Sequence, residues 1–173
     1  MASIGNYAYI LKCRLAVGRS RNANEPLRLA HAVRHLGDAY HYAGRGSLAE
    51  TCYVEALSIY HSHEDRRPLD FANAIRSFAV LKDELGAVEE AEHLWLEAHD
   101  IYRCLDVPAG VAECAARLAL LARHRGNLQR SQEWLDQAIT AADSADDEET
   151  LQYVREVSAQ TSSVDRENTI IKR

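Results

Sequence analysis

The sequence predicts an all-α solenoid of three helical hairpins, because two kinds of residue recur together along the chain. The prolines Pro26, Pro68 and Pro108 are separated by 42 and then 40 residues, and a glycine follows each by 18 residues, at positions 44, 86 and 126. Between them, apolar residues step by three and four, which is the period of a helix with one buried face. A repeat of this length is typical of stacked helical hairpins.

Further positions keep the same phase and predict the core. Small residues recur at three positions of each repeat and large apolar residues at two, so that neighbouring helices can approach closely around a filled interior. The matching triplets are Ala30, Ala72 and Ala112; Leu36, Phe78 and Leu118; Ala49, Ala91 and Ser131; Tyr53, Trp95 and Leu135; and Ala56, Ala98 and Ala138.

Each repeat is expected to fold as helix, turn and helix. Proline is tolerated in a first helical turn, and glycine is common where a helix ends. The first helices are expected at about 26–43, 69–85 and 109–125, and the second helices at about 47–61, 88–103 and 128–142. Ser47 and Glu50 have the spacing of a capping box, and Asn127 can cap the last second helix.

Two flanking helices complete a predicted single domain over residues 1–160, with repeats at about 26–66, 68–106 and 108–145. A helix over 5–17 places apolar side chains on one face and is expected to cover the first repeat; they are Ile4, Tyr7, Leu11 and Leu15. A capping helix over 147–159 carries Leu151, Val154 and Ser158 on one face. Residues 161–173 are predicted to be a flexible tail.

Composition and charge exclude several functional classes. The 173 residues carry a net charge of −6, which argues against a general nucleic-acid binder. Residues 1–87 hold 11 basic and 9 acidic side chains, whereas residues 88–173 hold 9 and 17, so the two halves are electrostatically complementary. The apolar stretch at 7–17 is too short to span a membrane. Four isolated cysteines predict reduced thiols and a cytoplasmic protein.

The candidate catalytic and metal-binding residues favour binding over chemistry. His31 and His35 share a helix face, but no Glu completes a metalloprotease pattern and no third ligand is evident. His61 and His63 are expected in an exposed turn, and His93 and His99 on an exposed helix face. We therefore expect no enzyme activity, no catalytic residue, no metal and no cofactor.

The repeated residues resemble the tetratricopeptide repeat (TPR), in its longer form of about 42 residues found in kinesin light chains. The resemblance covers residues 26–142, and Ser131, Lys82 and Ala122 depart from the usual pattern. It rests on Leu36, Gly37, Tyr40, Gly44, Ala49, Tyr53 and Ala56; on Phe78, Ala79, Gly86, Ala91, Trp95 and Ala98; and on Leu118, Ala119, Gly126, Leu135 and Ala138.

The resemblance implies a right-handed α-solenoid whose first helices line a concave groove that binds a protein or peptide segment. The implied groove residues are His31, Arg34, His35, Asp38 and His41; Asn73, Arg76, Ser77, Val80 and Asp83; and Glu113, Arg117, Leu120 and Arg123. An arginine stripe of Arg34, Arg76 and Arg117 favours an acidic segment or the C-terminus of a partner protein. Alternatively, these arginines pair with Asp38, Asp83 and Glu113.

These observations predict a protein- or peptide-binding adaptor or scaffold in the cytoplasm, without nucleic-acid or membrane binding. Two alternatives remain open at this stage. One is a regulatory or sensor module of a signalling or transcription system. The other is a structural unit that self-associates through its ends into a homo-oligomer. A fold of this class does not by itself identify its partner.

Overall fold

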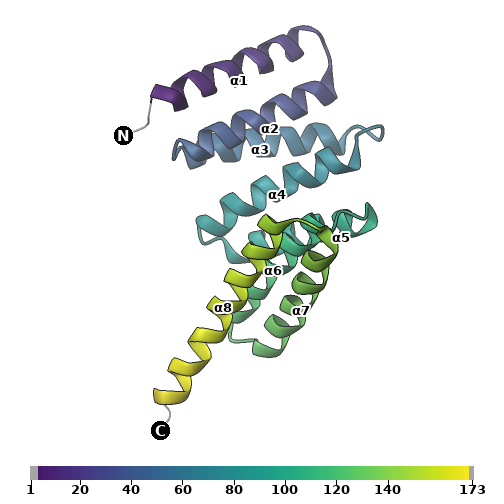
Figure 1. The fold of residues 1–173 in the computed structure, drawn as a ribbon. Coiled ribbons are helices and arrows are strands. Elements are labelled where there is room, and N and C mark those ends of the chain that lie inside the picture. The colour runs from purple at the N-terminus through teal and green to yellow at the C-terminus, as the bar shows by residue number, and fades with distance from the viewer. Residues whose placement is uncertain (1–3, 172–173) are drawn as a thin grey trace. The chain divides into compact units, whose positions relative to one another are not determined.

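The computed structural model describes the backbone of residues 4–171 and the side chains of residues 6–161, and the described backbone contains eight α-helices and no strand (Figure 1). The helices are α1 (Ile4–Asn22), α2 (Pro26–Tyr42), α3 (Gly46–His61), α4 (Pro68–Glu84), α5 (Val88–Cys104), α6 (Pro108–His124), α7 (Leu128–Ala145) and α8 (Glu148–Ile171). The predicted all-α solenoid of helical hairpins is confirmed. The helices of the three repeats begin and end within three residues of the expected positions.

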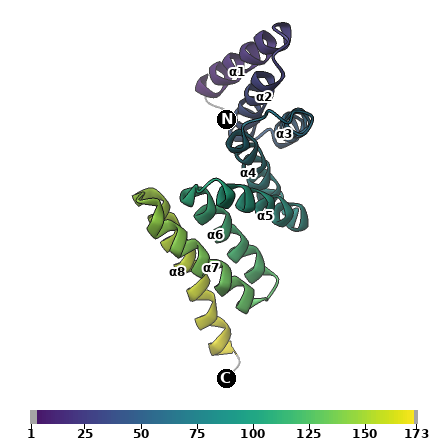
Figure 2. The same cartoon turned by 90° about the vertical axis from the view of Figure 1, so that its right-hand side faces the viewer.

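The helices form two compact units, residues 1–94 and 95–173, and the single domain over 1–160 stays a prediction. In the N-terminal unit, α1 packs on α2, α2 on α3, and α3 on α4, with a smaller contact between α2 and α4. In the C-terminal unit, α6 packs on α7, and α8 lies against both (Figure 2). Packing within each unit therefore joins helices that are neighbours or next neighbours in the sequence.

The recurring prolines and glycines have the structural roles that the sequence predicts. Each proline lies in the first turn of α2, α4 or α6, where its missing N–H breaks no helical hydrogen bond. The glycines at 44, 86 and 126 have φ angles of +69°, +71° and +76°. This left-handed conformation costs glycine little and ends a helix. Each glycine therefore fixes the turn between the two helices of a hairpin.

The core consists of the repeated positions. The alanines at 30, 72 and 112 and at 56, 98 and 138 are fully buried, and Tyr53 and Trp95 fill the large positions of their repeats. Ser131 replaces a buried alanine, and its hydroxyl donates a hydrogen bond of 2.8 Å to the carbonyl of Ala119. Burial of the Ser131 hydroxyl therefore leaves no polar group of that side chain unsatisfied.

Helix α1 buries a different face from the one predicted. Its packed residues are Ile10, Cys13 and Val17, which join the core of α2 and α3. The predicted packing residues Tyr7, Leu11 and Leu15 are exposed instead. Because α1 carries apolar residues on two faces, the helical period alone could not select the buried one. The side chain of Ile4 lies outside the described side chains.

The start of α3 also differs from the prediction. The helix begins at Gly46, so Ser47 lies inside it, and the side chain of the cap residue Arg45 makes no capping hydrogen bond. Glu50 instead accepts a hydrogen bond of 2.6 Å from Lys82 Nζ, which also lies 2.7 Å from Glu90. The expected cap at Asn127 is confirmed, since its side chain accepts a 3.1 Å hydrogen bond from the N–H of residue 130.

The C-terminal helix is longer than predicted. Helix α8 begins at Glu148 and continues to Ile171, through most of the segment assigned to a tail, while residues 172–173 lie outside the described residues. Among the described side chains of α8, Val154 and Val157 are the buried apolar ones, and Leu151 is half-buried. Among residues 4–171, no helix combines the length and apolar character that a membrane crossing needs.

Candidate functional site

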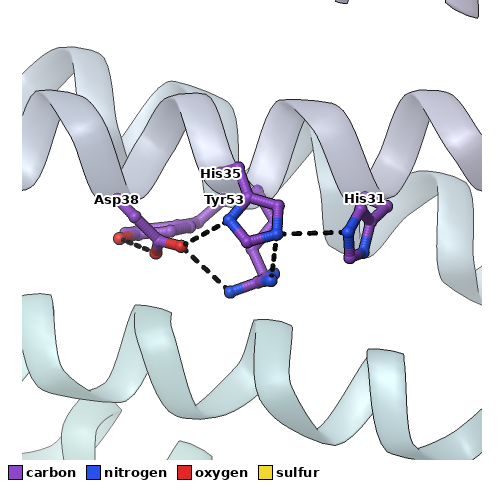
Figure 3. A network of polar contacts seen from close by, with 5 residues as sticks. His31, His35, Asp38 and Tyr53 are labelled. Atoms are coloured by element: carbon purple, nitrogen blue, oxygen red, sulfur yellow. Dashed lines mark hydrogen bonds and ion pairs between the residues drawn. The ribbon is translucent and has the colours of Figure 1, made fainter. Parts of the chain in front are cut away.

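A network of polar side chains lies on α2. Residues three and four apart share a helix face, so His31, Arg34, His35 and Asp38 are neighbours. Arg34 Nη1 donates to Asp38 Oδ2 at 2.9 Å, and Arg34 Nη2 lies 2.7 Å from His35 Nε2. Figure 3 shows the labelled side chains of His31, His35 and Asp38 on the same side of α2. The Arg34 side chain is only 12% exposed, so the network holds a largely buried charge.

Asp38 is the anchor of this network. The hydroxyl of Tyr53 on α3 donates a 2.9 Å hydrogen bond to Asp38 Oδ1, and His35 Nδ1 lies 3.5 Å from Oδ2 (Figure 3). Burial by itself would raise the pKa of Asp38, but hydrogen bonds from His35, Tyr53 and Ser77 and the charge of Arg34 lower it. Asp38 therefore stays ionised and fixes the position of the Arg34 guanidinium.

The two histidines of the network are in contact. Their Nε2 atoms are 3.1 Å apart, and the two rings meet edge to face. Desolvation lowers the pKa of His31, and the neighbouring His35 and Arg34 lower it further. A neutral imidazole pair can share one hydrogen bond, with one ring donating and the other accepting. This arrangement favours a neutral His31 at pH 7.

A cleft of about 470 Å³ opens beside His31 in the N-terminal unit. Residues from α1, α2, α3 and α4 line it, and its polar residues are Ser20, Arg28, His31, Tyr60, Arg67 and Asp70. Arg28 lies 3.2 Å from Glu25 and Arg67 lies 3.7 Å from Asp70, but both arginine side chains are mostly exposed. Such surface pairs contribute little free energy, so either arginine can turn toward a ligand.

Tyr60 provides a buried polar group in the wall of this cleft. The residue is 1% exposed, and its hydroxyl makes no hydrogen bond to any described residue. Burial and the nearby negative charge of Asp70 raise the pKa of Tyr60 to about 12, so the hydroxyl remains protonated. Buried hydroxyls in folded proteins almost always have a partner. The Tyr60 hydroxyl is therefore an unsatisfied donor buried behind the wall of the cleft.

The other predicted groove residues of the N-terminal unit lie on α2 and α4. His41 Nε2 is 2.7 Å from Glu84 Oε2, so this histidine links the two helices. All five predicted residues of α4 are half-buried: Asn73, Arg76, Ser77, Val80 and Asp83. Ser77 also joins the network through its hydrogen bond to Asp38. The structure thus brings the α2 residues and Ser77 together, and it places the remaining α4 residues on the half-buried surface of α4.

The predicted groove residues of the C-terminal unit lie half-buried on α6, and they are Glu113, Arg117, Leu120 and Arg123. The Arg117 guanidinium lies 5.6 Å from the ring centroid of Tyr153 on α8. Helix α8 thus contacts a face that the sequence assigns to a ligand. The sequence left open whether the arginines bind a ligand or pair with acidic neighbours, and Arg34 pairs with Asp38. An arginine stripe that joins Arg34 and Arg76 to Arg117 remains a prediction.

Sequence reasoning missed the cleft residues and misplaced one histidine. Arg28, Tyr60, Arg67 and Asp70 were not predicted, although Tyr60 and Tyr102 keep the 42-residue phase and could have drawn attention to this position. His99 was expected on an exposed face but is 4% exposed, with its ring edge-on to Trp134 at 5.2 Å. In residues 6–161, no cluster of three His, Cys, Asp or Glu side chains could hold a metal ion.

Helical hairpins in this phase, with glycine turns and alanine contacts, define an all-α helical-repeat solenoid whose fold is similar to that of tetratricopeptide-repeat proteins. Among solved structures, BtubC (BKLC) from P. vanneervenii, a kinesin light chain-like TPR protein, matches with a TM-score of 0.70 and 20% sequence identity. The match covers 88% of this chain and 63% of that protein, and it shows a shared fold. No protein-family model and no curated protein matches the sequence.

Proposed function

We propose that this protein is a protein-binding scaffold whose N-terminal unit holds a carboxylate of a partner segment in the cleft beside α2. The observation that carries the proposal is the buried Tyr60 hydroxyl, which has no hydrogen-bond partner among the described residues and lies in a wall shared with Arg28, Arg67 and His31. We propose binding without catalysis, in the cytoplasm, as four free cysteines favour.

The chemistry of the wall favours an acidic group over a cation. A carboxylate accepts charge-assisted hydrogen bonds from guanidinium groups, and a tyrosine hydroxyl can add a further donor. Asp70 would repel this ligand in part, but Arg67 already lies near Asp70 and offsets its charge. A cleft of about 470 Å³ suits an acidic side chain or a polypeptide terminus rather than a folded domain.

The proposal gives Arg34 a different role from the one that the sequence suggests. Its two Nη atoms already contact Asp38 and His35, so Arg34 holds the network in place. Arg28 and Arg67 are exposed, and their surface ion pairs with Glu25 and Asp70 contribute little free energy. We therefore propose that these two arginines make the first contacts with the ligand. The acidic segment or C-terminus expected from the sequence thus stays the proposed partner, but its contact site is the cleft.

The test is a titration with a library of acidic peptides, each made with a free and with an amidated C-terminus. We expect Tyr60→Phe to weaken binding of the best peptide about tenfold or more, because a hydrogen bond to a charged group contributes about 1.5–3 kcal/mol. Arg67→Gln should weaken it similarly. Arg103→Gln is the matched control, since Arg103 is an equally exposed arginine of the C-terminal unit.

The amidated peptides separate the two sources of the carboxylate. If the amidated peptide binds more weakly than the free one, the bound carboxylate is the peptide terminus. If both forms bind equally and a Glu→Gln substitution in the peptide abolishes binding, the bound carboxylate is a glutamate side chain. Binding that Tyr60→Phe and Arg67→Gln both leave unchanged would exclude the cleft as the site. Circular dichroism of each variant confirms that the helices are retained.

A further inference from the structure

Helix α1 has an exposed apolar face in addition to its packed one. Tyr7, Leu11 and Leu15 are 57%, 59% and 54% exposed. Their spacing of four residues places them along one side of the helix, which we call the outer face of α1. Large exposed apolar side chains gathered on one face commonly mark an interaction surface. The cleft beside α2 uses Ala16 and Ser20, which lie on a different side of α1.

Basic side chains surround the outer face of α1. The helix carries Lys12, Arg14, Arg19 and Arg21 and no acidic residue. Arg45 adds a further positive charge, since its guanidinium lies 5.5 Å from the ring centroid of Tyr7. A partner for this face must therefore supply an apolar groove and negative charge.

The C-terminal unit of the same protein has such a groove. A cavity of about 330 Å³ lies between α7 and α8, and we call it the α7/α8 groove; its apolar wall consists of Ile139, Ala142, Leu151 and Val154. Ile139 is 40% exposed. Asp143 and Arg155 both line the groove, and the surrounding segment 136–160 holds seven acidic side chains against Arg155 as its one basic side chain.

We propose that copies of this protein associate head to tail, with the outer face of α1 of one copy packed in the α7/α8 groove of another. Helices dock in apolar grooves through apolar side chains on one helical face, and the outer face presents three such side chains at successive steps of four residues. The opposite charges of the two surfaces orient the encounter. This inference is independent of the carboxylate site in the cleft.

The charges of the two surfaces favour contact between different surfaces over contact between like surfaces. Two α1 helices face to face would bring together two basic surfaces, in each of which Arg21 alone pairs with an acidic side chain of the described residues, Glu55 at 2.5 Å, and two α7/α8 grooves would bring together two acidic segments. Both pairings are repulsive, so neither symmetric dimer is favoured. A contact between two different surfaces leaves one of each free, and it therefore continues into a ring or an open filament.

The test uses the protein of residues 1–173 in analytical ultracentrifugation at increasing protein concentration and at low and high salt. We expect the average mass to rise with concentration and to fall with salt, because exposed charges are screened. Leu11→Glu and Ile139→Arg should each reduce the protein to a monomer. Leu48→Glu, at another exposed leucine of the N-terminal unit, should leave assembly unchanged.

Mixing the two blocked variants gives the most specific result. Leu11→Glu retains its groove and Ile139→Arg retains its outer face, so together they should form a dimer of twice the monomer mass and nothing larger. Asp143→Arg provides a second groove variant at an exposed position if Ile139→Arg fails to fold. A wild-type protein that is monomeric up to about 1 mM would overturn the proposal, and so would a mixture that remains monomeric.

Discussion

Replacing Gly37 by alanine should destabilise the N-terminal unit, although alanine is the better helix former. A Cβ atom at Gly37 would lie 2.7 Å from Tyr53 Cε1 and 2.9 Å from Tyr53 Cδ1. The Tyr53 ring cannot easily move away, because it is fully buried and its hydroxyl holds Asp38 at 2.9 Å. The new methyl group must therefore displace the ring or the helix.

The two opposing effects can be compared in magnitude. Alanine in place of glycine inside a helix gains about 1 kcal/mol. Overpacking a filled core costs about 1–3 kcal/mol, and a weakened hydrogen bond to the charged Asp38 adds up to about 1.5–3 kcal/mol. We expect a net loss of about 2 kcal/mol. For a protein of this size, that loss lowers Tm by about 4–8 °C.

Urea denaturation followed by circular dichroism measures this change. Gly18→Ala is the matched control in α1, where an added Cβ meets nothing within 4 Å, and it should stabilise the protein by about 0.5–1 kcal/mol. Introduced into a Tyr53→Leu background, Gly37→Ala should cost much less, because the clashing ring is gone. A Gly37→Ala variant as stable as wild type would refute the reasoning.

Two further predictions concern ionisable groups. Because the pKa of Asp38 is lower in the folded protein, Asp38 stabilises the fold above about pH 4 and loses this contribution as pH falls through its folded pKa. Asp38→Asn should thus reduce the urea midpoint more at pH 7 than at pH 3, and equal deficits at both values would contradict this. Of the four thiols only Cys104 is exposed, so Ellman's reagent should modify one thiol quickly and the other three after unfolding. Rapid modification of two or more would contradict the packing.

The recurrence of the same residue types at equivalent positions of three repeats predicts most of the fold, because each repeat makes equivalent contacts between its helices. Ala56, Ala98 and Ala138 are fully buried as expected, since each stands where two helices come closest. The position of Gly37 shows the limit of this reasoning. Its equivalents Ala79 and Ala119 accept a Cβ, whereas the conformation of Tyr53, which the sequence does not give, leaves no space for one at Gly37.

The features that sequence missed depend on more than one helix. Helix α1 has two apolar faces, so only its packing on α2 shows that Ile10 is buried and Leu11 exposed. The cleft gathers residues from four helices, and its key group, the Tyr60 hydroxyl, is marked by its burial and by the lack of a hydrogen-bond partner among the described residues. A missing hydrogen bond cannot be seen in a sequence pattern.

The neighbour-to-neighbour packing of the helices bears on how the protein reaches its fold. Within each unit, α1 to α4 and α6 to α8 contact helices that are at most two steps away in the sequence. Short sequence separation between contacts reduces the entropy lost in loop closure, which speeds folding. Hairpins of this kind can also form and open one at a time. Amide hydrogen exchange should therefore be graded along the sequence, with α1 opening before the α2–α3 hairpin on which it rests.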